Sequence, residues 1–316
     1  MPHLSVDFDD NLDELEYDVR FRPDKPKKLK HDRPPVAAPP AQAGDDSPRD
    51  FNPSFTGSRH EREWIMTYLG HFYTDGVITD VLRQVKGGKE ATVYCCRANP
   101  AIGVDLIAAK VYRPRMFRQL RNDAVYRQGR EVIGEEGKEV RGRREKLAMH
   151  KKTDFGQTLR HTTWLANEFQ TLQRLYAAGA DVPKPFATGD NAILMEYVGE
   201  ETFPAPALGQ VRLDPRAARP LFERLMHNVE LMLAHDRVHA DLSAYNVLYW
   251  NGQVKIIDLP QAIDPFVNPE AFALLGRDIE RLCQYFARYG VTANATQITR
   301  SLWDHYVLHP GKGAKL

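Results

Sequence analysis

The sequence has few cysteines, no long apolar run and almost no net charge, and each absence excludes a class of protein. Three cysteines in 316 residues cannot supply a disulfide framework. Cys95 and Cys96 are adjacent and have no C-x-x-C spacing, so we expect reduced packing residues rather than a metal site. No stretch reaches the roughly 18 apolar residues of a membrane helix, and the acidic N-terminus lacks the features of a signal peptide. We therefore expect a cytoplasmic protein with no membrane partner.

The composition is that of an ordinary globular protein, but the charges are unevenly distributed. With 42% hydrophobic and 27% charged residues, the chain can bury the core of one large domain or of two lobes. Residues 1–55 are acidic, then basic, then proline-rich, which predicts a disordered N-terminal tail, with a docking arm for a partner as the alternative. Residues 113–160 contain more basic than acidic residues and several glycines, which predicts a flexible basic loop.

The hydrophobic periodicity changes from strand-like to helical along the chain. Three β-rich runs separated by turn residues predict an antiparallel meander, at 78–85, 92–99 and 104–113. A further strand is predicted at 192–198, and helices are predicted at 61–73, 162–179, 215–235 and 268–290. A sheet-rich N-lobe over 56–198 and a mainly helical C-lobe over 199–316 together predict a bilobal α+β fold.

A lysine and a glutamate occupy unusual positions in these elements. Lys110 lies within the alternating apolar strand IAAKVY, where an ammonium group is costly unless it meets an anion. Glu168 lies in the middle of the helix WLANEFQTLQRL, among apolar residues that would face the sheet. Protein kinases use such a strand lysine and helix glutamate to hold the α- and β-phosphates of ATP. The pair therefore predicts a phosphate site, if other residues of such a site follow.

The segment VHADLSAYNVLYWNGQVKIIDL, residues 238–259, supplies those residues. His239-x-Asp241-x4-Asn246 has the spacing of the kinase catalytic loop H-R-D-x-x-x-x-N, with alanine in place of arginine, and Asp258 follows at the end of the strand VKIID. One carboxylate near an acceptor hydroxyl and two oxygen ligands for Mg²⁺ are what phosphoryl transfer requires. The alternative, that Asp241 and Asn246 only stabilise a turn, does not account for the preceding lysine and glutamate in the order that kinases have them.

The turn VKGGKEATVY joins two predicted strands and contains Gly87 and Gly88. Glycine tolerates dihedral angles that bring backbone N–H groups close to phosphate oxygens, so the turn is a candidate phosphate loop. A hairpin turn without a ligand is the alternative, because such turns are common.

Together these motifs resemble the RIO-type atypical protein kinases, specifically the branch without a winged helix. The match runs from about Trp64 to Tyr289. GGKEATVY resembles the phosphate loop of the family, which typically reads S-T-G-K-E-A-x-V-Y. VHADLSAYNVLY and IIDLPQAIDP resemble its catalytic and metal loops, and the basic stretch 113–160 lies where the family has a flexible loop. The resemblance implies a kinase-like fold with an antiparallel-sheet N-lobe and a mainly helical C-lobe.

The resemblance also implies a role for each matching residue. Lys110 would contact the α- and β-phosphates of ATP with Glu168 orienting it, and Asp241 would either accept the proton of the attacking hydroxyl or orient that hydroxyl. Asn246 and Asp258 would ligate Mg²⁺, with Mn²⁺ as an alternative metal. The other expected nucleotide-binding residues are Gly87, Gly88, Lys89 and Glu90 in the phosphate loop and Met195, Glu196 and Val198 at the hinge.

Two further residues are expected to support the catalytic loop, and three features depart from the kinase pattern. His239 would hold the loop by hydrogen bonding, and Asp278 resembles the buried helix aspartate that anchors this loop in kinases. Asp258 is followed by Leu-Pro instead of Phe-Gly, and the phosphate loop lacks two hydroxyls. Because only residues 259–268 separate Asp258 from the next predicted helix, we expect a truncated activation segment and no usual platform for a peptide.

The implied activity is that of an ATP- and Mg²⁺-dependent serine/threonine protein kinase or ATPase. It would transfer the γ-phosphate of ATP to protein, including itself, or to water. If it acts mainly as an ATPase, a phosphorylated aspartate would correspond to Asp258. The resemblance further implies a part in ribosome assembly, with ribosomal RNA or a pre-ribosomal particle bound through the basic loop.

Two other functions remain open. The first is a small-molecule phosphotransferase of the aminoglycoside or choline type, because those enzymes share H-x-D-x4-N and also lack a long activation segment. The sequences K-E-A-T-V-Y and L-S-A-Y-N favour the RIO type over it. The second is a nucleotide-regulated module that binds RNA or an acidic protein through the basic loop and tail.

Overall fold

The structure is a computed structural model that describes residues 51–88, 90–112, 154–189 and 191–309. In the helix that begins at Asp154, side chains are described from Trp164 onward. Three features predicted from the sequence therefore lie outside the described residues: the tail up to residue 50, Lys89, and the basic loop up to residue 153.

Residues 51–55 differ from the tail prediction. The Phe51 side chain is only 4% exposed and belongs to the core of the N-lobe. The N–H of Phe55 donates to the carbonyl of Val81 at 2.9 Å. The side chains of Phe51 and Phe55 both pack in this core. Residues 51–55 therefore belong to the N-lobe, and the predicted tail of residues 1–55 is too long at its C-terminal end. The other predicted domain boundaries stay predictions.

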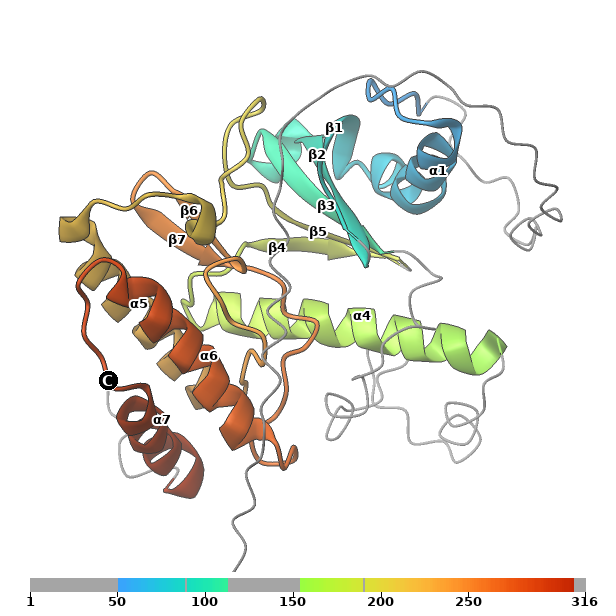
Figure 1. The fold of residues 1–316 in the computed structure, drawn as a ribbon. Helices are drawn as coiled ribbons and strands as arrows, with labels where there is room; N and C mark the ends of the chain where they lie inside the picture. The colour runs from blue at the N-terminus through green and yellow to red at the C-terminus, as the bar shows by residue number, and fades with distance from the viewer. Residues whose placement is uncertain (1–50, 89, 113–153, 190, 310–316) are drawn as a thin grey trace, which may run out of the picture. The chain divides into compact units, whose positions relative to one another are not determined.

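A five-stranded antiparallel sheet forms the N-lobe (Figure 1). Its strands are β1 (Ile78–Gly87), β2 (Ala91–Ala98), β3 (Leu106–Tyr112), β4 (Pro185–Thr188) and β5 (Ala192–Glu196). Their order across the sheet is β1-β2-β3-β5-β4, and a short 3₁₀ turn, η1 (Pro100–Ile102), joins β2 to β3. The meander and the strand at 192–198 are confirmed. The sequence does not predict β4, which has only four residues and begins with proline.

The helix α1 (Arg59–Thr74) covers one face of this sheet. Ser58 caps the helix: its side chain accepts the N–H of Glu61, and the carboxylate of Glu61 accepts the N–H of Ser58 at 3.1 Å. The buried residues of α1 that pack in one cluster with the strands are Ile65, Leu69 and Phe72. On the sheet side this cluster contains Tyr94, Cys96, Ile107, Ala109 and Leu194.

The helix α4 (Asp154–Ala177) lies on the opposite face and contacts β4 and β5 (Figure 1). It begins earlier than the predicted helix at 162–179. Its buried hydrophobic residues are Leu165, Phe169, Leu172 and Leu175, and they belong to a second cluster that includes Tyr112 and Ile193 of the sheet. Because this second cluster continues into the C-lobe, α4 connects the sheet to the helical half of the protein.

The C-lobe consists of helices and one short hairpin. The elements are η3 (Leu208–Gln210), α5 (Pro215–Ala234), β6 (Val247–Trp250), β7 (Gln253–Ile256), α6 (Ala271–Ala287), α7 (Ala295–Trp303) and a π-helical turn, η4 (Asp304–Leu308). The prediction that α6 begins at Asn268-Pro269 is wrong. Asn268 instead accepts the N–H of Glu270 with its side chain at 2.9 Å, and the helix begins after this turn.

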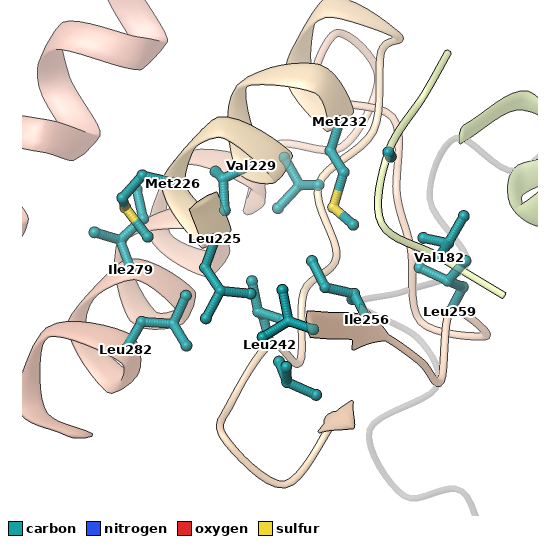
Figure 2. Packing of buried hydrophobic residues seen from close by; sticks show 14 of the residues in the cluster. Val182, Leu225, Met226, Val229, Met232, Leu242, Ile256, Leu259, Ile279 and Leu282 are labelled. Carbon is teal, nitrogen blue, oxygen red and sulfur yellow. The ribbon is translucent and has the colours of Figure 1, made fainter. Parts of the chain in front are cut away.

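The core of the C-lobe lies between α5, α6 and the catalytic hairpin. Figure 2 shows Leu225, Val229 and Met232 of α5 projecting toward Leu242 and Ile256. Met226 lies on the side of α5 that faces Ile279 of α6 (Figure 2). Leu242 precedes β6, and Ile256 ends β7. This packing fixes the segment that carries the expected catalytic and metal residues against two helices.

All three cysteines lie in described residues and are buried free thiols, as expected for packing residues. In the same part of the chain, no helix has the length and apolar character needed to cross a bilayer.

We expect Leu225→Ala to lower the free energy of unfolding by about 2–5 kcal/mol, because Leu225 is fully buried and the substitution leaves a cavity. Leu308→Ala removes the same atoms from a residue that is 58% exposed, so it should change stability by less than about 0.5 kcal/mol. Urea unfolding of both variants checks the difference. Equal losses would show that the core does not have this packing.

Candidate active site

The expected phosphate, metal and catalytic residues come from four separate elements. Lys110 lies on β3, Glu168 on α4 and Asp258 directly after β7, whereas Asp241 and Asn246 lie between α5 and β6. Side-chain contacts join Lys110, Glu168 and Asp258 in one group and Asp241 and Asn246 in another. The hairpin β6–β7 connects the two groups.

Lys110 is a cation held between two carboxylates. The register pairs it with Val93 of β2 and Ile193 of β5, which places its side chain on the sheet face opposite to α1. Its Nζ lies 2.9 Å from Oε1 of Glu168 and 2.7 Å from Oδ1 of Asp258. Burial disfavours the charge, but the carboxylates of Asp258 and Glu168 outweigh burial and hold the pKa of Lys110 well above its usual range. The same ammonium group lowers the pKa of Asp258, so this ion pair is charged at neutral pH.

The sequence does not identify Tyr112, which orients the glutamate of this group. Its hydroxyl donates to Oε2 of Glu168, and the Nζ of Lys110 lies 5.2 Å from the centre of its ring. Glu168 therefore binds Lys110 with one oxygen and Tyr112 with the other, which fixes the rotation of its carboxylate. The spacing of two residues between Lys110 and Tyr112 on a strand is the signal that both side chains share a face.

The helix α6 holds the backbone of the catalytic loop. The carboxylate of Asp278, which is 2% exposed, accepts the N–H groups of Ala240 at 2.7 Å and of Leu242 at 2.9 Å. Arg277 donates to the carbonyl of Ala240. Ala240 has a φ of 65°, which is unfavourable for a residue with a side chain and persists only where the surroundings impose it. Asp278 thus occupies the anchoring position that the resemblance implies.

His239 connects the catalytic loop to the hairpin. Its Nδ1 accepts the N–H of Asp241 at 3.3 Å, which leaves Nε2 as the donor to the carbonyl of Ile257 at 3.1 Å. Burial lowers the pKa of His239, so the ring is neutral at pH 7. Because both ring nitrogens are bonded within the protein, His239 holds the loop and is not placed to transfer a proton.

Asp241 is a partly exposed carboxylate that accepts a hydrogen bond at each of its two oxygens. Its Oδ1 accepts a hydrogen bond from Nη1 of Arg281 at 2.9 Å, and its Oδ2 accepts one from Nδ2 of Asn246 at 3.2 Å. The side chain of Asp241 is 38% exposed, so a hydroxyl group can approach it from solvent. The sequence does not identify Arg281, although its position three residues after Asp278 places both on one face of α6.

Asn246 and Asp258 offer the two oxygen donors expected for a metal ion. The N–H of Ile257 donates to the carbonyl of Asn246 at 2.9 Å, so the hairpin brings Asn246 beside the residue that precedes Asp258. The Nδ2 of Asn246 is used by Asp241, which leaves its Oδ1 as the free end of the amide. Among the described residues, no three His, Cys, Asp or Glu side chains form a complete metal site. One carboxylate and one amide oxygen, from Asp258 and Asn246, fit Mg²⁺, which is usually held by one or two carboxylates together with water and phosphate oxygens.

The phosphate loop does not use its glycines as expected. Neither Gly87 nor Gly88 has a positive φ, so the expectation of special dihedral angles is wrong. Both glycines are instead places of close contact. A Cβ atom on Gly87 would lie 2.6 Å from the side-chain amide of Gln84, and one on Gly88 would lie 3.1 Å from the carbonyl oxygen of Ala91. The absence of side chains here allows a tight hairpin.

Glu90 is exposed in this hairpin, whereas Lys89 lies outside the described residues. Although the side chain reaches solvent, the surrounding protein desolvates its carboxyl group and so raises the pKa of Glu90, and the negative charge of Asp258 raises it further. The carboxylate of Glu90 is therefore close enough to the metal loop to sense its charge, and any cation bound there would reverse this effect.

The expected hinge residues lie at the end of β5: Met195 and Glu196 are its last two residues, and Val198 follows it. Met195 and Glu196 pair with Ala108 and Ile107, and the N–H of Glu196 donates to the carbonyl of Lys184 at 2.8 Å. The N–H of Val198 has no hydrogen-bond partner in the described part of the chain. Among the expected hinge residues, Val198 thus has a backbone N–H group that is open to a ligand.

The anchoring aspartate generates a pH prediction. Burial raises the pKa of Asp278 from its ordinary value near 3.8 to about 7. Between pH 5 and 7 the folded chain therefore binds a proton that the unfolded chain has lost, which stabilises the fold more at the lower pH. We therefore expect the free energy of unfolding to fall by on the order of 1 kcal/mol for each pH unit over this interval. Above about pH 7 this dependence should disappear, because Asp278 is then ionised in both states.

Asp278→Asn removes the titrating group, so the free energy of unfolding of this variant should depend less on pH over the same interval. Urea unfolding at several pH values measures the slope, with Asp75→Asn, at an exposed aspartate, as the matched control. A slope that Asp278→Asn leaves unchanged would contradict the assignment.

Sequence comparisons identify the family. A family model described as the RIO domain matches residues 124–299, which is more than half of the chain. A RIO-type serine/threonine-protein kinase Rio1 of Haloferax volcanii is 32% identical over 235 residues, covering 71% of this chain and 69% of that protein. Human serine/threonine-protein kinase RIO1 is 30% identical over 232 residues, covering 73% of this chain. The chain spans only 37% of the length of the human protein.

Solved structures agree on the fold. The Rio2 kinase of Chaetomium thermophilum, described as an ADP/Mg²⁺-phosphoaspartate complex, matches with a TM-score of 0.55 and 17% identity. The match covers 83% of this chain and 72% of the Rio2 chain. At this identity the similarity shows the fold alone, and it confirms the bilobal kinase-like α+β architecture. By its sequence matches and its fold, the chain belongs to the RIO family of atypical serine/threonine protein kinases.

Proposed function

We propose that the chain catalyses the ATP- and Mg²⁺-dependent transfer of a γ-phosphoryl group to a serine or threonine hydroxyl of a protein, which can be the chain itself, or to water. The observation that carries this proposal is the contact of Lys110 with both Glu168 and Asp258. A buried cation beside a carboxylate that can hold Mg²⁺ is the arrangement that binds the phosphates of ATP. The relatives at 30% and 32% identity are named serine/threonine-protein kinases, which supports the same activity.

The described residues divide the work of this reaction. The N–H of Val198 would bond the adenine, and Lys110 would bond the α- and β-phosphates. Asn246 and Asp258 would hold Mg²⁺, which supplies charge neutralisation at the phosphates; Mn²⁺ has the same ligand preference for oxygen. Asp241 accepts the proton of the hydroxyl as its oxygen bonds to the γ-phosphorus. The bond from this phosphorus to the bridging oxygen breaks, and ADP leaves with that oxygen.

Asp258 offers a second acceptor in place of a hydroxyl. Its side chain is 43% exposed, and its Oδ1 is bound to Lys110. Attack of this carboxylate on the γ-phosphorus would release ADP and form an acyl phosphate, which water would then hydrolyse to phosphate and the free carboxylate. The related Rio2 structure is described as a phosphoaspartate complex, which supports this route.

The segment that would contact a protein acceptor, between Asp258 and α6, is short. Residues 259–270 connect Asp258 to α6, and the pairing of Val238 with Ile263 holds their first part against the catalytic loop. A protein acceptor would therefore bind without the usual activation segment. We propose a protein substrate or the chain itself in the cytoplasm, and a pre-ribosomal particle or ribosomal RNA as the partner of the basic stretch 113–160.

Labelled ATP distinguishes these routes. We expect the purified chain, incubated with Mg²⁺ and γ-labelled ATP, to yield label on protein or as free phosphate. Asp241→Asn should lower this turnover by roughly 10²- to 10⁴-fold while ATP still binds, because the proton acceptor is lost. Asp75→Asn, at an exposed aspartate of the N-lobe, is the matched control and should react like the wild type.

Each outcome has a distinct meaning. Acid-stable label on serine or threonine indicates a protein kinase, whereas free phosphate with hydroxylamine-labile label indicates an ATPase that uses Asp258. Neither product, in a chain that binds ATP, would favour a small-molecule phosphotransferase or a nucleotide-regulated binding module. Undiminished turnover of Asp241→Asn would remove Asp241 from its proposed role.

Asp258→Ala tests the metal assignment separately. The substitution removes one of the two oxygen donors, so the gain in ATP affinity on adding Mg²⁺ should decrease more than it does in Asp241→Asn. Titration calorimetry with and without Mg²⁺ measures this gain for each variant. Equal effects of the two substitutions would contradict the division between a metal ligand and a proton acceptor.

A further inference from the structure

Lys86 precedes the glycine pair and lies on the sheet face that carries the site. The register pairs Lys86 of β1 with Val93 of β2, and Val93 with Lys110 of β3. Residues directly opposite each other in antiparallel strands point to the same face, so Lys86 and Lys110 share one. A register shift between Gln84 and Lys86 reverses the alternation at this point. Gln84 accordingly points the other way and, in the amide orientation that satisfies its neighbours, donates to Glu61 of α1 at 2.7 Å.

The backbone of the glycine turn is occupied. In the same amide orientation, Gln84 accepts the N–H of Gly87 at 3.2 Å, and the N–H of Gly88 donates to the carbonyl of Ala91 at 2.9 Å. Residues 85–88 contain no hydroxyl side chain. In this conformation neither glycine offers an N–H group to a phosphate, so the side chains of the loop must supply the attraction.

The ammonium group of Lys86 is available for that purpose. Its side chain is exposed and has no hydrogen bond or ion pair with any residue that the structure describes. Lys110, on the same face of the sheet, is by contrast bound to two carboxylates.

We propose that Lys86 is a second phosphate-binding cation, which binds the β- and γ-phosphates of ATP while Lys110 binds the α- and β-phosphates. This inference deepens the proposed function and rests on it. The two lysines are two strands apart, about 10 Å across the sheet, so they flank a triphosphate chain rather than share one oxygen. The flexible stem of Lys86 allows its charge to reach the terminal phosphates.

Calorimetric titration of the full chain with ATP, ADP and adenosine, each in the presence of Mg²⁺, tests the proposal. Lys86→Met should weaken ATP binding by about tenfold, because a charge-assisted contact is lost, and should weaken ADP binding less. Adenosine binding and the unfolding temperature should not change. Lys86→Arg should keep the affinity for ATP, and Arg59→Met, at an exposed cation of α1, is the control for loss of one positive charge.

Other outcomes of this titration would contradict the proposed role of Lys86. If Lys86→Met binds ATP like the wild type, or loses affinity for adenosine to the same extent, Lys86 is not a phosphate ligand. If Lys89→Met shows the phosphate-dependent loss and Lys86→Met does not, the role belongs to Lys89. A wild-type chain that binds no ATP would overturn the proposed function itself, whereas wild-type binding with an unchanged Lys86→Met overturns this inference alone.

Discussion

The charge of Lys110 is the constraint on which the arrangement of the site depends. An ammonium group in the middle of a sheet is tolerated only where anions replace its lost hydration. Glu168 and Asp258 do so at 2.9 and 2.7 Å, and they come from elements far apart in the sequence. One buried cation therefore fixes the position of α4 over the sheet and that of the end of β7. Tyr112 extends the constraint, since its hydroxyl holds the second oxygen of Glu168.

A second buried ionisable group, the carboxyl group of Asp278, decides the conformation of the catalytic loop. The loop needs a left-handed residue at Ala240, and such a conformation costs of order 1–3 kcal/mol. Two N–H bonds to the Asp278 carboxylate offset this cost, as does the contact of Arg277 with the Ala240 carbonyl. The same helix face presents Arg281 to Asp241. The position of the proton acceptor is therefore set by the packing of α6 and not by the loop alone.

Spacing along the chain was sufficient to predict the bilobal fold and residues that the structure brings together, such as Lys110 with Glu168 and Asp241 with Asn246. These residues have chemically distinctive neighbours: a lysine in an apolar strand, or polar groups at the end of strands. Tyr112 and Arg281 carry no such signal, because a tyrosine in a strand and an arginine on a helix are ordinary until their partners are known. The use of Gly87 and Gly88 was mispredicted for a similar reason, since their role depends on contacts with Gln84 and Ala91.

The charge of Lys110 already has partners before any nucleotide enters. Its Nζ lies 2.7 Å from Oδ1 of Asp258 and 2.9 Å from Oε1 of Glu168, so a phosphate that binds Lys110 competes with these carboxylates for the ammonium group. On the proposed function, ATP brings both halves of the exchange: a phosphate for Lys110 and a metal cation for Asp258. The buried ammonium group of Lys110 then keeps a partner of opposite sign throughout binding, which avoids the cost of several kcal/mol that an unpaired buried charge would incur. ATP without a cation would leave Asp258 unpaired beside the phosphates, and this repulsion makes metal and nucleotide binding mutually dependent.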